Sequence, residues 1–492
     1  MNPLKRLAGQ TVVYGLSSIV GRFLNYLLVP LHTNVFSTDQ YGIIGEMYSY
    51  VAFLVVLLTY GMETSFFRFW NKQDGNEASV YKTAVFSLLA SSGIFILLSH
   101  LQSQSIADWL HYPNHSEYVT WFAIIVGLDA VSSLPLARLR ASNKAVRFAK
   151  INLINVAINI GLNVFFIGYC IPTYENGGNF ITDVFYDPSI GVGYVFIANL
   201  IASIVKFALV IPVIRIRGGG FSVAIWKQMM SYGLPMLFLG LAGIVNETID
   251  RIMLKRILIH ERGELKTMAT VGIYSAVYKI SIVMLLFLQA FRYAAEPFFF
   301  SEEKSKDAKK TYSKVMTYFV IVMAGIFLSV MLFLDVVKYF IHHDYWEGLH
   351  VVPVLLLANI FLGVYYNQSI WYKLTDKTMY GAYIAGIGAF ITIVLNWWLI
   401  PIIDYTGSAW ATFFAYGTMM VLSYIWGQRH YPVRYNLKKI IFYMALSLLL
   451  YGLALILDFD GGWLHYLIRF ALIGIFLFAV YILEWPTKKT GQ

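Results

Sequence analysis

The sequence has little charge and almost no cysteine. Charged residues make up 13% of its 492 residues, about half of the roughly 25% that is typical of soluble domains. Cys170 is the single cysteine, which excludes an intrachain disulfide and a cysteine metal cluster. Hydrophobic residues make up 58% of the chain, and the loops between apolar segments leave no room for a soluble catalytic domain. We therefore expect an all-α integral membrane protein that is not an enzyme.

Apolar windows long enough to cross a bilayer recur along the chain. A membrane-spanning helix needs about 20 residues, and the sequence predicts fourteen such helices, at residues 11–34, 41–65, 82–101, 117–137, 147–171, 190–212, 229–250, 271–297, 312–334, 349–371, 379–403, 407–427, 438–457 and 463–485. The first window follows Lys5 and Arg6. We interpret it as an uncleaved span, because it is too long for a signal peptide and lacks a small-residue cleavage site.

The distribution of basic residues supports this count. If the N-terminus lies inside, most of the 37 Lys and Arg residues fall in inner segments, as the positive-inside rule requires. We therefore predict that both termini lie on the inner side. One predicted outer loop, 251–270, is an exception, because it holds five basic residues: Arg251, Lys255, Arg256, Arg262 and Lys266. Apart from two neighbouring glutamates, the sequence offers no account of them.

Two pairs of segments indicate an internal repeat. Residues 41–68 align without gaps onto 271–298, and residues 141–167 align onto 374–400. Their order and spacing predict two pseudo-symmetric six-helix lobes of the same orientation, as in transporters with parallel repeats. We divide the chain into an N-lobe (1–217), a C-lobe (218–430) and a final part (431–492) with two C-terminal helices and a tail.

Basic residues inside the apolar windows indicate a hydrated interior. A charge at bilayer depth costs about 2.5–3.5 kcal/mol and usually faces protein or a water-filled cavity. Arg22 shares one helical stripe with Asn25 and His32, so we predict that Arg22 and Asn25 line a central cavity. The alternative for Arg22 is a structural salt bridge. Lys279 and Arg292 are further candidates in the eighth window, although Arg292 has Glu296 at ion-pair spacing.

Amides and acids complete the candidate site. Asn152, Asn155 and Asn159 recur at helical spacing with Asn163, and they either line the cavity or form interhelical hydrogen bonds. The acidic residues within spans are Glu46, Glu63 and Asp129. Each is a candidate for coupling to H⁺ or Na⁺, or else neutralises a nearby cation. Glu247 and Arg251 have the spacing of a helix-end ion pair. No histidine or acidic spacing indicates a metal site, and no cofactor is predicted.

Four segments carry a family resemblance: 22–45, 138–148, 250–254 and 272–298. They resemble the bacterial polysaccharide-repeat and O-antigen flippases of the multidrug/oligosaccharidyl-lipid/polysaccharide (MOP) exporter superfamily. The resemblance implies two six-helix lobes with two extra helices, located in the bacterial cytoplasmic membrane. It also implies a substrate, a polyprenyl-diphosphate-linked oligosaccharide, moved from the inner to the outer leaflet for surface polysaccharide biosynthesis. No nucleic-acid partner is expected.

Three alternatives remain open at this stage. Lipid II flippases share the implied architecture, and drug or cation extruders of the superfamily typically have twelve spans. A membrane polysaccharide polymerase or glycosyltransferase would be expected to carry catalytic residues on a large outer loop. The outer loop 172–189 holds only Glu175, Asp183 and Asp187 as acidic residues, which disfavours that class.

Overall fold

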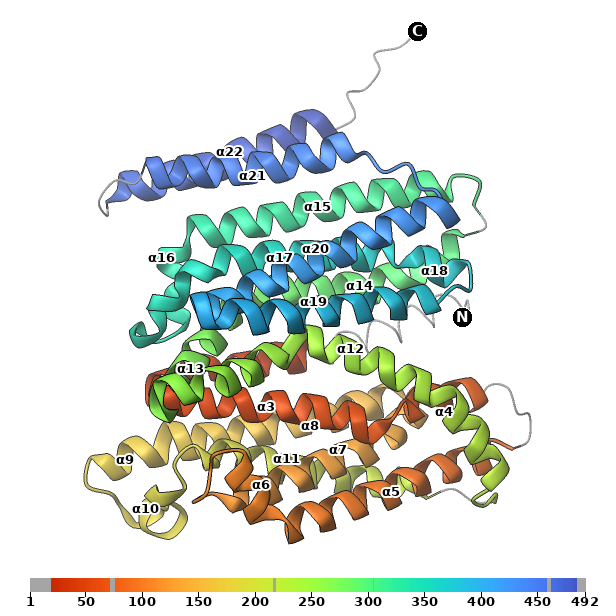
Figure 1. Cartoon of the computed structure of the whole chain (residues 1–492), viewed down its shortest axis with the longest axis vertical. Coiled ribbons are helices and arrows are strands. Elements are labelled where there is room, and N and C mark those ends of the chain that lie inside the picture. The colour runs from red at the N-terminus through yellow and green to blue at the C-terminus, as the bar shows by residue number, and fades with distance from the viewer. Residues whose placement is uncertain (1–18, 71–75, 216–217, 304, 458–461, 485–492) are drawn as a thin grey trace. The chain divides into compact units, whose positions relative to one another are not determined.

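The computed structural model describes residues 19–70, 76–215, 218–303, 305–457 and 462–484. All regular elements in these ranges are helices (Figure 1), which confirms the all-α prediction. The chain packs as two compact units. Unit 1 holds residues 1–276 with 392–405, and unit 2 holds residues 277–391 with 406–492. This division follows packing rather than the sequence repeat, so the predicted lobes stay a prediction.

Unit 1 is a helical bundle. Residues 19–26 are helical, and the helices that follow are α2 (Leu28–Val35), α3 (Thr38–Thr59), α4 (Met62–Trp70), α5 (Glu77–Leu101), α6 (Ser103–Trp109), α7 (Ser116–Ala141), α8 (Ala145–Asn163), the π-helix η1 (Val164–Cys170), α9 (Ile171–Glu175), α10 (Phe180–Phe185), the 3₁₀ turn η2 (Pro188–Ile190), α11 (Gly193–Ile214) and α12 (Val223–Arg262). Local signals set several ends. A capping box between Ser37 and Gln40 starts α3, and Gly263, at φ 77°, ends α12.

Unit 2 is a second bundle. Its helices are α14 (Ile282–Glu302), α15 (Ala308–Leu332), α16 (Leu334–Val337), the 3₁₀ segments η3 (Lys338–Phe340) and η4 (His343–Val351), α17 (Val352–Gln368), α18 (Ile370–Leu374), α20 (Tyr405–His430), α21 (Leu437–Ile456) and α22 (Trp463–Glu484). The unit boundary falls inside α13 (Glu264–Ile280) and α19 (Met379–Ile403). Helices α15, α21 and α22 share an apolar core that includes Leu328, Tyr443 and Phe476.

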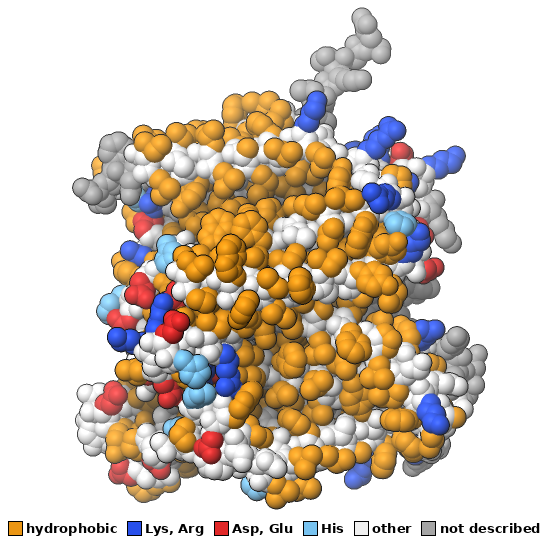
Figure 2. Space-filling model, in the orientation of Figure 1, with side chains coloured by type: hydrophobic (Ala, Val, Ile, Leu, Met, Phe, Trp, Pro, Cys, Tyr) orange, Lys and Arg blue, Asp and Glu red, His pale blue; other side chains and the backbone are white. Residues whose placement is uncertain are grey.

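Twelve described helices are long and apolar enough to cross a membrane, and each corresponds to one predicted window. In both units, hydrophobic side chains cover the middle of the helices and charged ones gather near their ends (Figure 2). Of the two remaining windows, 11–34 begins outside the described residues. Window 407–427 corresponds to the helix α20. Its many Gly, Ser, Thr, Trp and Tyr residues lower its mean hydropathy, so α20 is not one of the twelve. The coarse prediction of a multi-pass membrane protein therefore stands, without a settled count of fourteen.

Two predicted boundaries were wrong. The predicted outer loop 251–270 is helical, because α12 continues to Arg262 and α13 begins at Glu264. The predicted span 271–297 is interrupted at Ser281, between α13 and α14. The buried hydroxyl of Ser281 donates to the carbonyl oxygen of Tyr278 at 2.7 Å, which satisfies a backbone acceptor at this break.

Two turns at aligned positions of the predicted repeat have the same backbone conformation. In unit 1, Asn143 has φ 55° and the next amide, of Lys144, donates to the Leu139 carbonyl at 2.8 Å. In unit 2, the aligned residue Asp376 has φ 56° and the Lys377 amide donates to the Tyr372 carbonyl at 2.8 Å. Asn and Asp are among the few non-glycine residues that adopt the left-handed region readily. Aligned positions thus end their helices in the same way.

Helices α3 and α13 cross in unit 1 at two glycines. A Cβ added to Gly42 would lie 2.0 Å from the Met268 carbonyl oxygen, and one added to Gly272 would lie 1.8 Å from that of Thr38. Both distances are far below van der Waals contact. The crossing therefore requires glycine at both positions.

Candidate functional site

Arg22 lies on the first described helix and is exposed, as is Asn25 one turn later. Among the described residues, no acidic side chain pairs with Arg22. Its guanidinium acts electrostatically on Tyr26 of the same helix, as does Glu247 of α12. We call Arg22, Asn25, Tyr26 and Glu247 of unit 1 the Arg22 group. The salt-bridge alternative for Arg22 finds no partner in the described part of the chain.

The asparagines of α8 connect it to the N-terminal helices. The Asn159 amide donates to Asn25 Oδ1 at 3.1 Å, and Asn163 Oδ1 lies 2.8 Å from His32 Nε2. The Asn163 amide also donates to the Asn159 carbonyl at 2.7 Å. These contacts support the interhelical role for Asn159 and Asn163. Asn152 and Asn155 are partly buried, and Asn155 Oδ1 has no hydrogen-bond partner among the described atoms.

A buried ion pair links α3 to α12. Glu46 and Lys255 of α12 are 0% and 1% exposed, and Lys255 Nζ lies 2.8 Å from Glu46 Oε2. Lys255 also donates to the Leu110 carbonyl at 2.7 Å, and Tyr112 donates to Glu46 Oε2 at 2.5 Å. Burial, with the Glu46 carboxylate beside it, raises the pKa of Tyr112 well above its ordinary value of 10.0. The phenol therefore keeps its proton and remains a donor.

The other two acidic candidates also have cationic partners. Glu63 of α4 pairs with Arg140 of α7. Asp129 of α7 lies 2.6 Å from Lys206 Nζ of α11. A carboxylate that is already paired with a fixed cation attracts a further cation less strongly. The alternative in which these three acids neutralise neighbouring charges is therefore favoured over ion coupling.

The helical course of residues 251–262 accounts for most of the unexpected basic residues. Arg251 pairs with Asp250 at 3.0 Å, and its contact with Glu247 is to the backbone carbonyl rather than to the carboxylate. The Arg256 guanidinium stacks 3.9 Å from the centroid of the Trp109 ring, and Arg262 pairs with Asp404 in the turn between α19 and α20. With Lys255 held by Glu46, four of the five cations are held within unit 1. Lys266 is exposed.

The sequence analysis did not identify Glu247 as a candidate for ion coupling and gave it only as a partner of Arg251. It lies in the middle part of α12, in an apolar segment, yet its side chain is exposed. No described basic side chain forms an ion pair with it. The pattern could have revealed it, because Asp250 is adjacent to Arg251, three positions closer along the chain than Glu247, and competes for that guanidinium.

The remaining cationic candidates belong to unit 2. Lys279 is partly buried near the end of α13. Arg292 of α14 lies 4.1 Å from the centroid of the Tyr366 ring, beside a small cavity of about 20 Å³ that is also lined by Lys373. The predicted partner Glu296 lies outside the described side chains. A guanidinium over an aromatic face is stabilised without losing its charge, so Arg292 still carries a charge for an anion.

The histidines give no metal site that we can support. His342, His343 and Asp344 hold ligand atoms within 4.8 Å of one another, but two of the three side chains are exposed. Both imidazoles already contact the Asp344 carboxylate, at 3.2 Å and 3.0 Å. Three adjacent polar residues in one exposed turn often contact each other in this way, so we assign no ion to them.

Comparison with known proteins decides the family. Residues 7–302 match the sequence profile of the family described as "Polysaccharide biosynthesis protein". The chain belongs to this family. No curated protein matches the chain.

The chain shares its fold with solved membrane transporters, two of which are described as members of the MOP superfamily. A lipid II flippase, MurJ, in an inward closed conformation has a TM-score of 0.71 at 14% identity, covering 96% of this chain and 99% of that one. An inward-facing multidrug resistance transporter of the MATE family has a TM-score of 0.65 at 13% identity, covering 82% and 93%. An outward-facing MATE transporter has a TM-score of 0.59 at 12% identity, covering 85% and 95%. These likenesses confirm the predicted superfamily fold for this member of the polysaccharide biosynthesis family.

Proposed function

We propose that this protein is a flippase for a polyprenyl-diphosphate-linked oligosaccharide. It would move its substrate from the inner to the outer leaflet of a bacterial cytoplasmic membrane by alternating access, for surface polysaccharide or O-antigen biosynthesis. The family supports the biosynthetic role, and the fold of a lipid II flippase supports a lipid-linked substrate. In this proposal the chain has fourteen spans in two six-helix lobes with two additional C-terminal helices, and both termini lie inside.

The observation that carries the proposal is the state of Arg22. It is an arginine in an apolar segment, it is exposed, and no described acid neutralises it. The planar guanidinium stays charged and offers paired hydrogen bonds that fit a phosphate. We assign the diphosphate to Arg22, with Lys279 and Arg292 as further cations on its path. Asn25, Asn152 and Asn155 would meet sugar hydroxyls, and Asn159 would hold the Asn25 side chain in place through its hydrogen bond.

The membrane potential can contribute to the direction of transport. One elementary charge that crosses 100 mV gains or loses about 2.3 kcal/mol. With a negative interior, an anionic diphosphate moves outward downhill. A cation that travelled with the substrate would cancel this gain, so the mechanism requires Arg22 to remain in place while access alternates around it.

Coupling to H⁺ or Na⁺ would require an acid that is not already paired. Glu46, Glu63 and Asp129 each lie beside a cation, so we place coupling at Glu247 instead. Glu247 is exposed on unit 1 and acts on the same tyrosine, Tyr26, as Arg22 does. Protonation or cation binding at Glu247 would therefore change the field in which Arg22 holds an anion.

The decisive experiment is lipid extraction from a strain that lacks the gene. A flippase defect causes lipid-linked oligosaccharide to accumulate on the inner side. Wild type and an Asn34→Ala control should restore export, whereas Arg22→Ala should not, with the same amount of inserted protein. Surface polysaccharide at the wild-type level in the Arg22→Ala strain would remove Arg22 from the mechanism.

A lipid II flippase is the second candidate, because the MurJ structure covers nearly the whole chain. The same extraction separates the two functions. Accumulated lipid II would favour this candidate, and accumulated polysaccharide repeat would favour the first. Unpolymerised repeat on the outer side would contradict both and indicate a polymerase.

A further inference from the structure

A basic groove lies at the end of unit 2 where α15 and α21 begin. It encloses about 750 Å³ and is lined by six basic side chains: Lys306, Lys309, Lys310, Lys314, Arg434 and Lys439. Among the described residues that line it, two are acidic, Asp307 and Glu484. Figure 2 shows Lys and Arg side chains gathered at this end of the unit, at the upper right. We refer to this site as the basic groove.

The charge of the basic groove is mostly not compensated. Glu484 accepts two hydrogen bonds from Lys439, at 2.8 and 2.9 Å, and one from Tyr443 at 2.9 Å. Its negative charge therefore neutralises Lys439 and not the other cations of the groove. Within the described part of the chain, no acidic side chain pairs with Lys310, Lys314 or Arg434. All three are exposed. They are therefore available to an anion from solution or from the membrane surface.

Two helix N-termini add to this positive field. Both α15, which starts at Ala308, and α21, which starts at Leu437, begin at the groove. The first turn of a helix carries unpaired backbone N–H groups and a partial positive charge of roughly half an elementary charge. Anions, phosphate in particular, bind at such ends. The side chain of Asn436 caps only one amide of α21, that of Lys439, at 3.2 Å.

The walls of the groove are fixed in place. The Ser313 hydroxyl on α15 donates to the Arg434 carbonyl at 2.8 Å, which ties α15 to the segment before α21. The Gln428 amide donates to the Val433 carbonyl at 2.7 Å. Beneath them, Val433 packs with Phe299 and Tyr312 in an apolar cluster. A groove held in this way keeps its cations together before a ligand arrives, which lowers the cost of binding.

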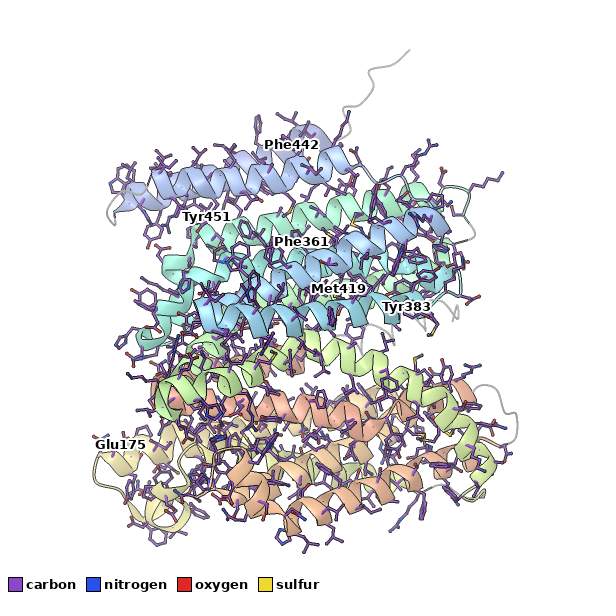
Figure 3. The ribbon with its side chains drawn as sticks, in the orientation of Figure 1. Glu175, Phe361, Tyr383, Met419, Phe442 and Tyr451 are labelled. Carbon is purple, nitrogen blue, oxygen red and sulfur yellow. The ribbon has the colours of Figure 1, made fainter. Side chains whose placement is uncertain are left out.

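The position of the groove favours a membrane lipid over a soluble anion. It lies at the ends of three candidate membrane spans, α15, α21 and α22. Beside it, Phe442 on α21 (Figure 3) is 44% exposed and Leu483 on α22 is 47% exposed. The Leu483 carbonyl accepts from Lys439 at 3.3 Å, so apolar surface continues directly from the cationic lining. Acyl chains attached to a phosphate would find this surface next to the headgroup.

We propose that the basic groove binds the phosphate headgroup of an acidic membrane phospholipid. Lys310, Lys314 and Arg434 would contact the phosphate oxygens, helped by the first amides of α15 and α21. The site is independent of the Arg22 group and of the transport reaction. Basic pockets beside membrane helices bind anionic headgroups by the same chemistry.

The test compares lipids on the full-length protein in detergent. The thermal unfolding midpoint should rise on addition of dioleoyl-phosphatidylglycerol and not on addition of dioleoyl-phosphatidylcholine, because a ligand that binds only the folded state stabilises it. In the triple variant Lys310→Gln, Lys314→Gln and Arg434→Gln, the apparent affinity for phosphatidylglycerol should fall by about 100-fold. A matched control, Lys144→Gln, Arg147→Gln and Lys150→Gln, removes three exposed cations of unit 1 and should keep the wild-type shift.

Three results would overturn the proposal. One is an equal shift in the wild type and the triple variant. Another is an equal loss in the triple variant and the matched control, which would indicate general charge attraction. The third is a shift produced as well by inorganic phosphate alone, which would assign the groove to a soluble anion. Native mass spectrometry measures the amount of bound phosphatidylglycerol without unfolding the protein. It should rank the wild type and the matched control above the triple variant.

Discussion

Gly42 and Gly272 occupy equivalent positions of the sequence repeat and pack against each other. The amide nitrogen of each lies within 3.1 Å of the place where the other would carry a Cβ. The contact is reciprocal, since Gly42 meets the carbonyl of Met268 and Gly272 meets that of Thr38. Thr38 and Met268 have the offset of the repeat and lie three residues before its aligned segments begin. Gly45 likewise meets its own equivalent, Ser275, whose hydroxyl would lie 2.4 Å from an added Cβ. A local two-fold relation between α3 and α13 follows.

Alanine at either glycine should destabilise the protein. Gly42→Ala and Gly272→Ala each force a methyl group into backbone atoms that cannot rotate away, which we expect to cost about 3 kcal/mol. Unfolding in detergent, followed by temperature or denaturant, measures the loss. Gly93→Ala is the control, because nothing lies within 4 Å of its Cβ position in α5, and it should be neutral or slightly stabilising. Similar stability in all three variants would contradict the close crossing.

Loss of one partner of the buried pair should cost more than loss of both. Lys255→Met leaves the Glu46 carboxylate buried without its cation, and we expect the free energy of unfolding to fall by about 3–5 kcal/mol. Adding Glu46→Gln removes that charge and still offers Tyr112 an acceptor, so the double variant should regain more than half of the loss. Lys266→Met, at an exposed position, serves as the control. Strictly additive effects in the double-mutant cycle would show that the two side chains do not interact.

Ion coupling should depend on Glu247 and not on the paired acids. Glu247→Gln should abolish the response of flipping to an imposed H⁺ or Na⁺ gradient in proteoliposomes, with a stability change of no more than about 0.5 kcal/mol, as at other exposed positions. Glu63→Gln leaves Arg140 without its partner and should lower stability, yet the gradient response should remain. If only Glu63→Gln lost the response to the gradient, Glu63 and not Glu247 would be the coupling residue.

The ion pair of Asp335 and Arg469 predicts a stability change at acid pH. Burial alone would raise the pKa of Asp335, but the Arg469 guanidinium outweighs it and holds the pKa below the ordinary 3.8, with help from Tyr466 and His465. The pair therefore contributes fully above pH 3.8, and the contribution fades as the pH falls through the lowered pKa.

Arg469→Gln should thus lower stability at pH 7 by about 1 kcal/mol, and its difference from wild type should shrink at pH 3. Unfolding midpoints at the two pH values check this. Lys266→Gln, which removes an exposed cation, should show no such convergence. A gap between Arg469→Gln and wild type that is as large at pH 3 as at pH 7 would exclude the pair as its source.

The features that could be predicted depend only on residues close together in the sequence. Apolar windows predicted twelve helices that can cross a membrane, because the length of an apolar run is visible in a single segment. The repeat aligned Asn143 with Asp376, and both adopt the same left-handed turn. A residue with a rare backbone preference leaves a signal that needs no knowledge of distant contacts.

Partners far apart in the chain could not be predicted. Glu46 and Lys255 are 209 positions apart, and Arg262 and Asp404 are 142 apart. When these partners are not known, a stretch with five cations resembles a hydrated loop. The predicted span 229–250 therefore ended before the helix α12 does, at Arg262. The sequence did contain one signal. Acids such as Glu46 lie inside apolar windows and need cationic partners, and the excess of cations in 251–266 could supply them, because opposite charges in membrane segments tend to pair.

The contact between the two glycines has a consequence for the origin of the chain. A surface that meets its own equivalent through a two-fold axis is the kind that joins identical subunits in a dimer. If the repeat arose by duplication and fusion, a half-length ancestor with one such glycine would already have associated through it. In the present chain, neither glycine can change unless the opposite helix changes with it, so we expect the two positions to vary together among related sequences.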